Sequence, residues 1–286
     1  MNGSCADNLA AASVANYWIP FPPLDEQKRI ADYLDAKCAA IDADVAKRRE
    51  LVGKLREYRK CVIARAVTRG LDGSTPMMDS GVEWIGEIPE GWDYKRLKSF
   101  FVLSKAKNHP DAIVLSLYRE HGIVPKDSRD DNHNVTSLDT SDYKYVQPGD
   151  FVVNKMKAWQ GSMALSSHEG IVSPAYHVFK FASDALTPKY AHYLLRSRKY
   201  ADEWHRLSTG IRVGQWDLHP EDFLNTRIPL PPLDEQGRIA DYLDAKCAAI
   251  DADVAKQEEL ISKLGEYRKS VIHAAVIGRI DLSQGA

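Results

Sequence analysis

Basic side chains alternate with aromatic and amide side chains at two places in the middle of this chain. The members of the two clusters are Lys155, Lys157, Trp159 and Gln160, and then Arg206, Arg212, Gln215 and Trp216. Lysine and arginine neutralise phosphates, while arginine, asparagine and glutamine carry the paired groups that bind guanine and adenine edges in the major groove. These clusters indicate contact with nucleic acid. The alternative is a set of solvated side chains that bind nothing.

Positive charge is segregated along the middle of the chain. Between residues 80 and 228 there are 19 basic and 19 acidic residues, so the region as a whole is neutral. Residues 94–126 carry seven basic and two acidic residues, 151–216 carry nine and four, and 127–150 carry two and six. The first basic stretch adds Lys105, Lys107 and Arg119 to the candidate DNA-binding residues.

Sequence motifs of catalysis are mostly absent. We find no Gly-x-Gly-x-x-Gly, no Walker loop and no Asn/Asp-Pro-Pro-aromatic sequence of an amino-methyltransferase. Asp111 and Glu120 weakly resemble a nuclease carboxylate pair, but Gly122 stands where a lysine is needed. Eight of the nine histidines lie between 109 and 219 without metal-ligand spacing. We therefore expect no catalytic residue, no metal and no cofactor.

A duplicated segment flanks the middle region. Residues 19–69 return at 228–278, and 39 of the 51 positions are identical. Each copy begins with a proline pair and an acidic first turn, at Asp25 and Asp234, which suits the positive end of a helix dipole. A long helix is therefore expected to start near each of these residues.

Apolar residues in both copies follow a heptad spacing, which predicts that the helices pack against each other. The predicted seam consists of Leu34, Cys38, Ile41, Val45, Val52, Leu55, Val62 and Ala66, and of Leu243, Cys247, Ile250, Val254, Ile261, Leu264, Val271 and Ala275. Because one helix leads out to the middle region and the other leads back, pairing within one chain makes them an antiparallel coiled coil.

Arginines interrupt this seam and need partners if they are buried. A twofold axis through the helix midpoints would place residue i opposite residue 303 − i. This rule sets Arg59 opposite Asp244 and Arg268 opposite Asp35, and it brings Arg48 near Lys256 and Gln257. A register error of one turn would make Asp241 and Asp32 the partners. Alternatively, the arginine stems lie along the seam with their charges in water.

Length and composition are those of a soluble protein with about two domains. The chain has no apolar run long enough to span a membrane and no signal peptide at residues 1–18, so we expect a cytoplasmic protein. Its four cysteines lack metal spacing and are expected to be reduced. In the middle region, 112–118, 150–154 and 175–181 are expected strands, and a helix is expected from Thr187 to Leu207.

The chain also resembles a known family in four segments. Both helix openings, Pro22-Pro23-Leu24-Asp25-Glu26-Gln27 and its repeat at 231–236, are similar to the repeats of type I restriction-modification specificity subunits. The other similar segments are 80–92, Asn154-Lys155-Met156-Lys157-Ala158-Trp159-Gln160-Gly161, and Gly170-Ile171-Val172-Ser173-Pro174-Ala175-Tyr176.

The resemblance implies an α+β protein with one α/β target-recognition domain and two long repeat helices that form an antiparallel coiled coil. It implies domains at 1–18 (the stub of a missing recognition domain), 19–79 (first helix and connector), 80–228 (recognition domain) and 229–286 (second helix). Unlike the usual family member, this chain has one full recognition domain and not two.

The resemblance also implies a function. The expected protein is a non-catalytic reader of one half of a split site in double-stranded DNA. Its helices would dock methyltransferase (M) subunits that modify adenine N6, and a restriction (R) subunit is the further partner that the resemblance implies. A homodimer would supply a second reader. The remaining alternatives are a nuclease or methyltransferase with an unrecognised site and a coiled-coil scaffold without DNA affinity.

Overall fold

The structure is a computed structural model, and it describes residues 18–119, 122–128, 139–210 and 216–282. The chain divides into two compact units. The helical unit contains residues up to Leu55 and from Asp251 onward, and the mixed unit contains residues Arg56 to Ile250. Most of the predicted stub at 1–18, together with Arg212 and Gln215, lies outside the described residues.

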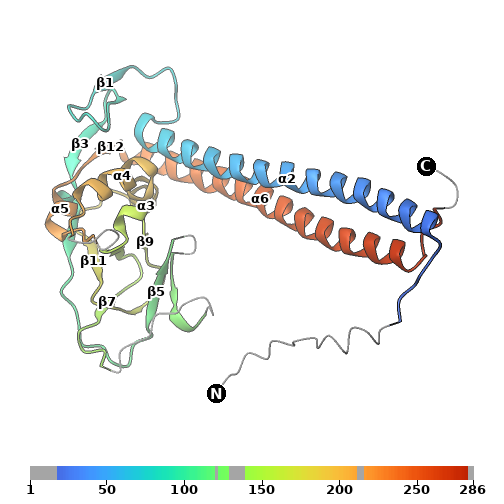
Figure 1. Cartoon of the computed structure of the whole chain (residues 1–286). Coiled ribbons are helices and arrows are strands. Elements are labelled where there is room, and N and C mark those ends of the chain that lie inside the picture. The colour runs from blue at the N-terminus through green and yellow to red at the C-terminus, as the bar shows by residue number, and fades with distance from the viewer. Residues whose placement is uncertain (1–17, 120–121, 129–138, 211–215, 283–286) are drawn as a thin grey trace. The chain divides into compact units, whose positions relative to one another are not determined.

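Both expected long helices are present (Figure 1). Helix α2 spans Leu24–Arg69 and helix α6 spans Leu233–Val276, so each begins one residue before its predicted acidic first turn. All sixteen predicted apolar seam positions are buried or partly buried, although most other positions on the two helices are exposed. This burial pattern is that of a helix with one packed stripe.

In the helical unit, the two helices contact each other through polar side chains of the seam and its edge. Arg48 donates a hydrogen bond from Nη1 to Oε1 of Gln257 at 2.9 Å, close to the predicted position. Arg268 Nε lies 3.1 Å from Oδ1 of Asp42. Because residue number rises along one helix as it falls along the other, these segments run antiparallel.

The predicted partner of Arg268 was wrong. It binds Asp42 and not Asp35, and the two observed contacts give sums of 48 + 257 = 305 and 268 + 42 = 310, against the expected 303. Both observed sums exceed 303, whereas pairing with the alternative partners Asp32 and Asp241 would give sums below 303. The register is therefore displaced in the direction opposite to those alternatives. The physical reason is that a long arginine side chain reaches a carboxylate at the exposed edge of the seam, which heptad spacing does not specify.

The mixed unit is built on a four-stranded antiparallel sheet in the order β4-β11-β8-β9, of which β11 and β9 are labelled in Figure 1. The strands span Phe101–Leu103 (β4), Tyr176–Phe181 (β11), Phe151–Asn154 (β8) and Met163–Leu165 (β9). Its aromatic core includes Phe101, Phe151, Phe179, Trp204 and Phe223, each at most 1% exposed. The strands predicted at 150–154 and 175–181 are therefore confirmed.

Helices α3 (Pro188–Arg196) and α4 (Arg198–Leu207) replace the single helix expected from Thr187 to Leu207. Proline at the first position suits the start, as predicted. The expectation of one continuous helix was wrong because Ser197 is extended (φ −63°, ψ 155°), which ends α3 and serves as the N-cap of α4. The buried faces carry Tyr190, Leu194, Tyr200 and Trp204.

Short strand pairs and turns complete the mixed unit. They are β1 (Met77–Asp79) with β2 (Glu87–Pro89), β3 (Asp93–Arg96) with β12 (Arg227–Leu230), β5 (Leu115–Tyr118) with β6 (Gly122–Pro125), and β7 (Lys144–Val146) with β10 (Gly170–Val172). The remaining elements are η1 (Leu97–Ser99), η2 (Lys126–Ser128), η3 (Ala158–Gln160) and α5 (Pro220–Asn225). The strand expected at 112–118 is β5, which begins at residue 115.

Within the mixed unit, the end of α2 meets the start of α6. Gly70 ends α2 with φ +70°, and a Cβ there would lie 3.0 Å from Oε1 of Glu235. Trp92 donates from Nε1 to Oε2 of the same carboxylate at 3.0 Å. Gln236 is fully buried, where it accepts from Thr187 N and donates to the carbonyls of Ala185 and Pro231.

Among the residues that the structure describes, no helix is both long enough and apolar enough to cross a membrane. Cys38, Cys61 and Cys247 are free thiols.

Candidate DNA interface

The first predicted basic and aromatic cluster lies in a tight turn between β8 and β9, at residues 154–160. Asn154 ends β8, and its Oδ1 accepts a hydrogen bond from the backbone N of Met156 at 3.1 Å. Ala158 is fully buried, and Gly161 closes η3 in the left-handed region with φ 74°. The turn therefore anchors Ala158 in the core and leaves Lys157 exposed.

Side chains from other elements hold this segment on several sides. The Nζ of Lys155 lies 3.0 Å from Oδ2 of Asp217. Trp159 packs edge-to-face against Trp216, with ring centroids 5.2 Å apart, and both rings contact His205. Trp216, a member of the second predicted cluster, and His205 of α4 are thus brought against the first cluster.

A lysine cluster lies beside the 154–160 segment and joins two candidates that are distant in sequence. Lys107 pairs with Lys144 in an isolated antiparallel bridge, and its Nζ binds Asp142 at 2.9 Å. Burial lowers the pKa of Lys144, and the positive charges of Lys155 and Lys107 lower it further. Lys144 donates to the carbonyl O of Tyr176. The three lysines therefore form one charged centre, in which Lys107 and Lys155 are each paired with an aspartate.

His177 lies next to this centre. Burial, reinforced by the charge of Lys144, lowers the pKa of His177 to about 4. The neutral ring donates from Nε2 to the carbonyl O of Leu218 at 3.2 Å. At neutral pH this histidine adds no charge to the lysine cluster.

Two of the remaining candidates have other contacts. Arg206 on α4 binds the buried Glu203 with Nε and Nη2, both at 2.7 Å, so half of its donor fork neutralises a carboxylate. Arg119 at the end of β5 donates to Gln160. Lys105 is exposed just after β4. A backbone bridge between Thr209 and Asp217 flanks the sequence that contains Arg212 and Gln215, which lie outside the described residues.

Sequence reasoning missed Lys144. It lies in the acidic stretch 127–150, and nothing near it in the sequence marks it as part of a basic site. Only the pairing of β7 with β10 and the bridge to Lys107 place it there. Within the described residues, no three histidine, cysteine or acidic side chains are grouped to hold a metal ion.

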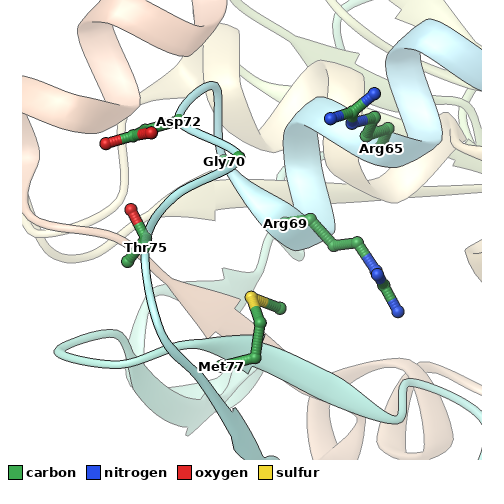
Figure 2. Close-up of a pocket in the computed structure, with 7 residues that line it drawn as sticks. Arg65, Arg69, Gly70, Asp72, Thr75 and Met77 are labelled. Atoms are coloured by element: carbon green, nitrogen blue, oxygen red, sulfur yellow. The ribbon is translucent and has the colours of Figure 1, made fainter.

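A separate cavity of about 360 Å³ lies where α2 ends (Figure 2). Arg65 and Arg69 extend from the last turns of the helix, and Asp72 and Thr75 lie on the loop that follows. Hydrogen bonds from Ser74 hold the pKa of Asp72 below its ordinary value. The cavity therefore mixes both charge signs, and none of the predicted DNA-binding residues lines it.

The residues of this interface lie within a match to a known family. The family model of the "Type I restriction modification DNA specificity domain" matches residues 89–261. The chain belongs to this family. The match includes every candidate DNA-binding residue, among them Lys107, the 154–160 segment and α4.

Curated relatives of this chain are named specificity subunits of type I restriction enzymes. The chain is 27% identical over 284 residues to the type I restriction enzyme MjaVIII specificity subunit of Methanocaldococcus jannaschii, covering 93% of this chain and 62% of that protein. It is 21% identical over 297 residues to the EcoKI specificity subunit of Escherichia coli K12, covering 97% and 61%. The chain thus spans about three fifths of the length of these relatives.

Solved structures support the fold. The HsdS subunit of Thermoanaerobacter tengcongensis aligns with a TM-score of 0.53 at 22% identity, covering 98% of this chain and 65% of that one. A chain from a structural study of complex assembly and conformational transition of the type I R-M system aligns with a TM-score of 0.68 at 20% identity, covering 94% and 63%. The mixed helix and strand fold is that of specificity subunits.

Proposed function

We propose that this chain is a non-catalytic DNA-recognition subunit of a type I restriction-modification complex, and that it reads one half of a split site. The observation that carries the proposal is the match to a DNA specificity family over 89–261, which contains the whole lysine cluster and the 154–160 segment. Lysines can neutralise phosphates at this surface, while Gln160 and neighbouring polar groups can contact base edges. The recognition domain would span residues 80–228, and the protein would act in the cytoplasm.

The long helices would serve as an antiparallel coiled coil on which methyltransferase subunits dock, with a restriction subunit joining the complex. In support, both helices bury one stripe and leave large side chains exposed elsewhere. Tyr58 and Tyr267 occupy equivalent positions in the two repeats and are 49% and 54% exposed. Repeated exposed aromatics suit two docking sites of the same kind.

A second recognition domain would cover the start of the first repeat. In the second repeat, Ile228 lies on β12 and is fully buried in the hydrophobic core of the mixed unit. Its equivalent Ile19 is 72% exposed, and Phe21 is 85% exposed. Gln236 makes several hydrogen bonds, one of them a local bond to Pro231 O. Among the described residues, its equivalent Gln27 reproduces only that local bond, to Pro22 O. We propose that a second copy of this chain supplies the missing cover in a homodimer.

Co-expression with a candidate type I methyltransferase subunit tests the main proposal. Methylated adenines are mapped in the host genome with and without this chain. We expect a single split motif that appears only when both proteins are present. Methylation or cleavage by this chain alone, removed by one substitution in it, would support the enzyme alternative. A complex without any DNA affinity would support the scaffold alternative.

A further inference from the structure

The two repeats differ in charge although most of their residues are identical. With histidine neutral, residues 19–69 carry twelve basic and eight acidic side chains, a net charge of +4. Residues 228–278 carry six basic and nine acidic side chains, a net charge of −3. Six of the twelve differing positions hold lysine or arginine in the first repeat only, and none does so in the second repeat only. The divergence between the repeats therefore runs in one direction.

The apolar seam is nearly the same in both repeats. Of its eight equivalent positions, seven hold the same residue, and the eighth is Val52 in the first repeat and Ile261 in the second. Packing along this seam would support three pairings almost equally: α2 with α6, α2 with the α2 of a second copy, and α6 with the α6 of a second copy. A preference among the three must come from the polar positions, which set partner choice in coiled coils.

Arg48 and Gln257 occupy the same position of the two repeats and lie opposite each other. Arg48 Nη1 donates to Oε1 of Gln257 at 2.9 Å, and the two residues are 209 positions apart, which is the repeat distance. In an antiparallel pair, a position that faces its own equivalent marks the local twofold axis. Arg48 Nε also lies 3.2 Å from Oδ1 of Asp44, and only 28% of the Arg48 side chain is exposed. The charge at the axis is thus partly shielded from water.

The same geometry determines what the other two pairings would bring together. Two α2 helices would place Arg48 against a second Arg48, with the Arg49 residues of both copies beside them. Two α6 helices would place Gln257 against Gln257, with a Glu258 from each copy nearby. Like charges a few ångströms apart repel, and more strongly where water is partly excluded. The net charges act in the same sense, since two first repeats carry +8 and two second repeats carry −6.

We propose that charge makes the pairing face of α2 selective, so that it accepts a helix of the second-repeat type and rejects another first repeat. The partner that fits this face is an acidic helix with the same apolar seam. This inference rests on the antiparallel coiled coil of the proposed function and adds what selects its partner, by repulsion in the wrong pairs as well as attraction in the right one. A second copy of this chain would accordingly associate without forming a pair of α2 helices.

Substitutions within the full chain reproduce each pairing in a single molecule. The arginine variant, Gln257→Arg with Glu258→Arg, imitates two first repeats. The acidic variant, Arg48→Gln with Arg49→Glu, imitates two second repeats. The exchanged variant carries all four substitutions, so each helix takes the charges that the other has in the wild-type protein.

The exchanged variant keeps a support for its transferred arginine. Asp253 is the equivalent of Asp44 and stands four residues before position 257, as Asp44 does before position 48. Hydrogen–deuterium exchange of the backbone amides at 30–55 and 251–270, followed by mass spectrometry, measures how often the helices open in each variant. This measurement needs no DNA and no methyltransferase subunit.

At about 0.05 M salt, the helix amides of the arginine variant are expected to exchange about 10-fold faster than those of the wild-type protein, and those of the acidic variant about 3- to 10-fold faster. The exchanged variant is expected to stay within about 3-fold of wild type, although it carries every substitution of the other two. At about 1 M salt all three variants should approach wild type, because salt screens the repulsion.

The control removes one positive charge from each helix away from the seam. Lys54 and Lys263 are equivalent positions, and each binds a glutamate of its own helix, Glu50 at 2.6 Å and Glu259 at 2.5 Å. The effects of Lys54→Gln and Lys263→Gln on exchange should multiply in the double variant, with no rescue of one by the other.

Two results overturn the inference. One is exchange at the wild-type rate in the arginine variant at low salt. The other is an exchanged variant whose acceleration equals the product of the accelerations in the arginine and acidic variants, because each substitution would then act on its own helix alone. If the helix amides of the wild-type protein are unprotected, the proposed coiled coil fails together with this inference, whereas either of the two results in a protected coil removes this inference alone.

Discussion

Lys155 and Lys157 are two residues apart but have different surroundings. Lys155 is 30% exposed in its side chain and bound to Asp217, whereas Lys157 is exposed at the start of η3. A phosphate can displace water from Lys157 at little cost, but at Lys155 it competes with a carboxylate. The two lysines should therefore contribute unequally to DNA binding.

Lys157→Ala is expected to weaken DNA binding by the assembled complex, with the slope of log affinity against log salt falling by about one. Lys155→Ala is expected to have a smaller effect on affinity, because its charge is already partly neutralised. Fluorescence anisotropy at several salt concentrations measures both. Lys98→Ala, an exposed lysine on η1, serves as the control. Equal behaviour of Lys157→Ala and the control would show that another face of the domain contacts DNA.

His177 makes the mixed unit sensitive to acid. Its pKa is depressed from 6.5 to about 4 in the folded protein, so the unfolded chain takes up a proton first as pH falls. The stabilisation by neutral His177 is complete above pH 6.5 and is lost as pH drops toward 4. Urea unfolding at pH 7, 5.5 and 4.5 should show a smaller decline in the free energy of unfolding for His177→Asn than for wild type. Parallel declines would contradict this.

At the scale of single residues, a binding site could be predicted from the sequence where the type of a residue and the types of its sequence neighbours point to the same role. The cluster from Lys155 to Gln160 lies in one turn and could be recognised from its composition. Lys144 could not, because its neighbours in sequence are acidic and its partners, Lys107 and Lys155, are reached only through strand pairing. The orientation of Gln160 also depends on residues 41 and more positions away, Arg119 among them.

At the scale of elements, the long helices were predictable because heptad spacing and acidic first turns are local signals. Their register was not, since it depends on how far arginine side chains reach along the neighbouring helix. The strands β8 and β11 were also predicted from β-branched and aromatic runs. The break at Ser197 was missed because a single serine between Arg196 and Arg198 leaves the helical spacing of the apolar residues intact on both sides.

The Arg268 and Asp42 contact is expected to couple energetically. Because both side chains are substantially exposed (40% and 59%), the coupling should be small, about 0.3–1 kcal/mol. A double-mutant cycle of Arg268→Met and Asp42→Ala by urea unfolding measures it. The external pair Lys263 and Glu259, one turn apart on α6, is the control for effects on a single helix. Coupling of Arg268 to Asp35 in place of Asp42 would restore the 303 register.

Gly70 is the residue where α2 turns into the connector. Alanine there would adopt a positive φ and bring its Cβ to 3.0 Å from Glu235 and 3.4 Å from Trp92. We expect Gly70→Ala to destabilise the protein by about 1–3 kcal/mol, the combined cost of strain and displaced contacts. Gly81→Ala is the matched control, because it shares a positive φ but has nothing within 4 Å of its Cβ. Equal losses would mean that strain alone acts at Gly70.

At the scale of the whole molecule, the two repeats differ in what covers their first residues. If a second copy covers Ile19 and Phe21, the protein should form a dimer at micromolar concentration, and Phe21→Asp should shift it to monomer. Leu51→Asp, which also places a charge on an exposed apolar position of the first repeat, is the control. Sedimentation equilibrium with and without DNA measures this. A monomer at tens of micromolar under both conditions counts against the homodimer.

The contact of Gly70 and Trp92 with Glu235 has a consequence for how such proteins change over generations. The chain leaves α2 and enters α6 at nearly the same point, so everything between residues 70 and 227 is attached through adjacent ends. A segment with adjacent ends can be exchanged as a cassette without stretching its host. Recombination between genes of this kind would therefore replace the mixed unit while the repeated helices stay unaltered.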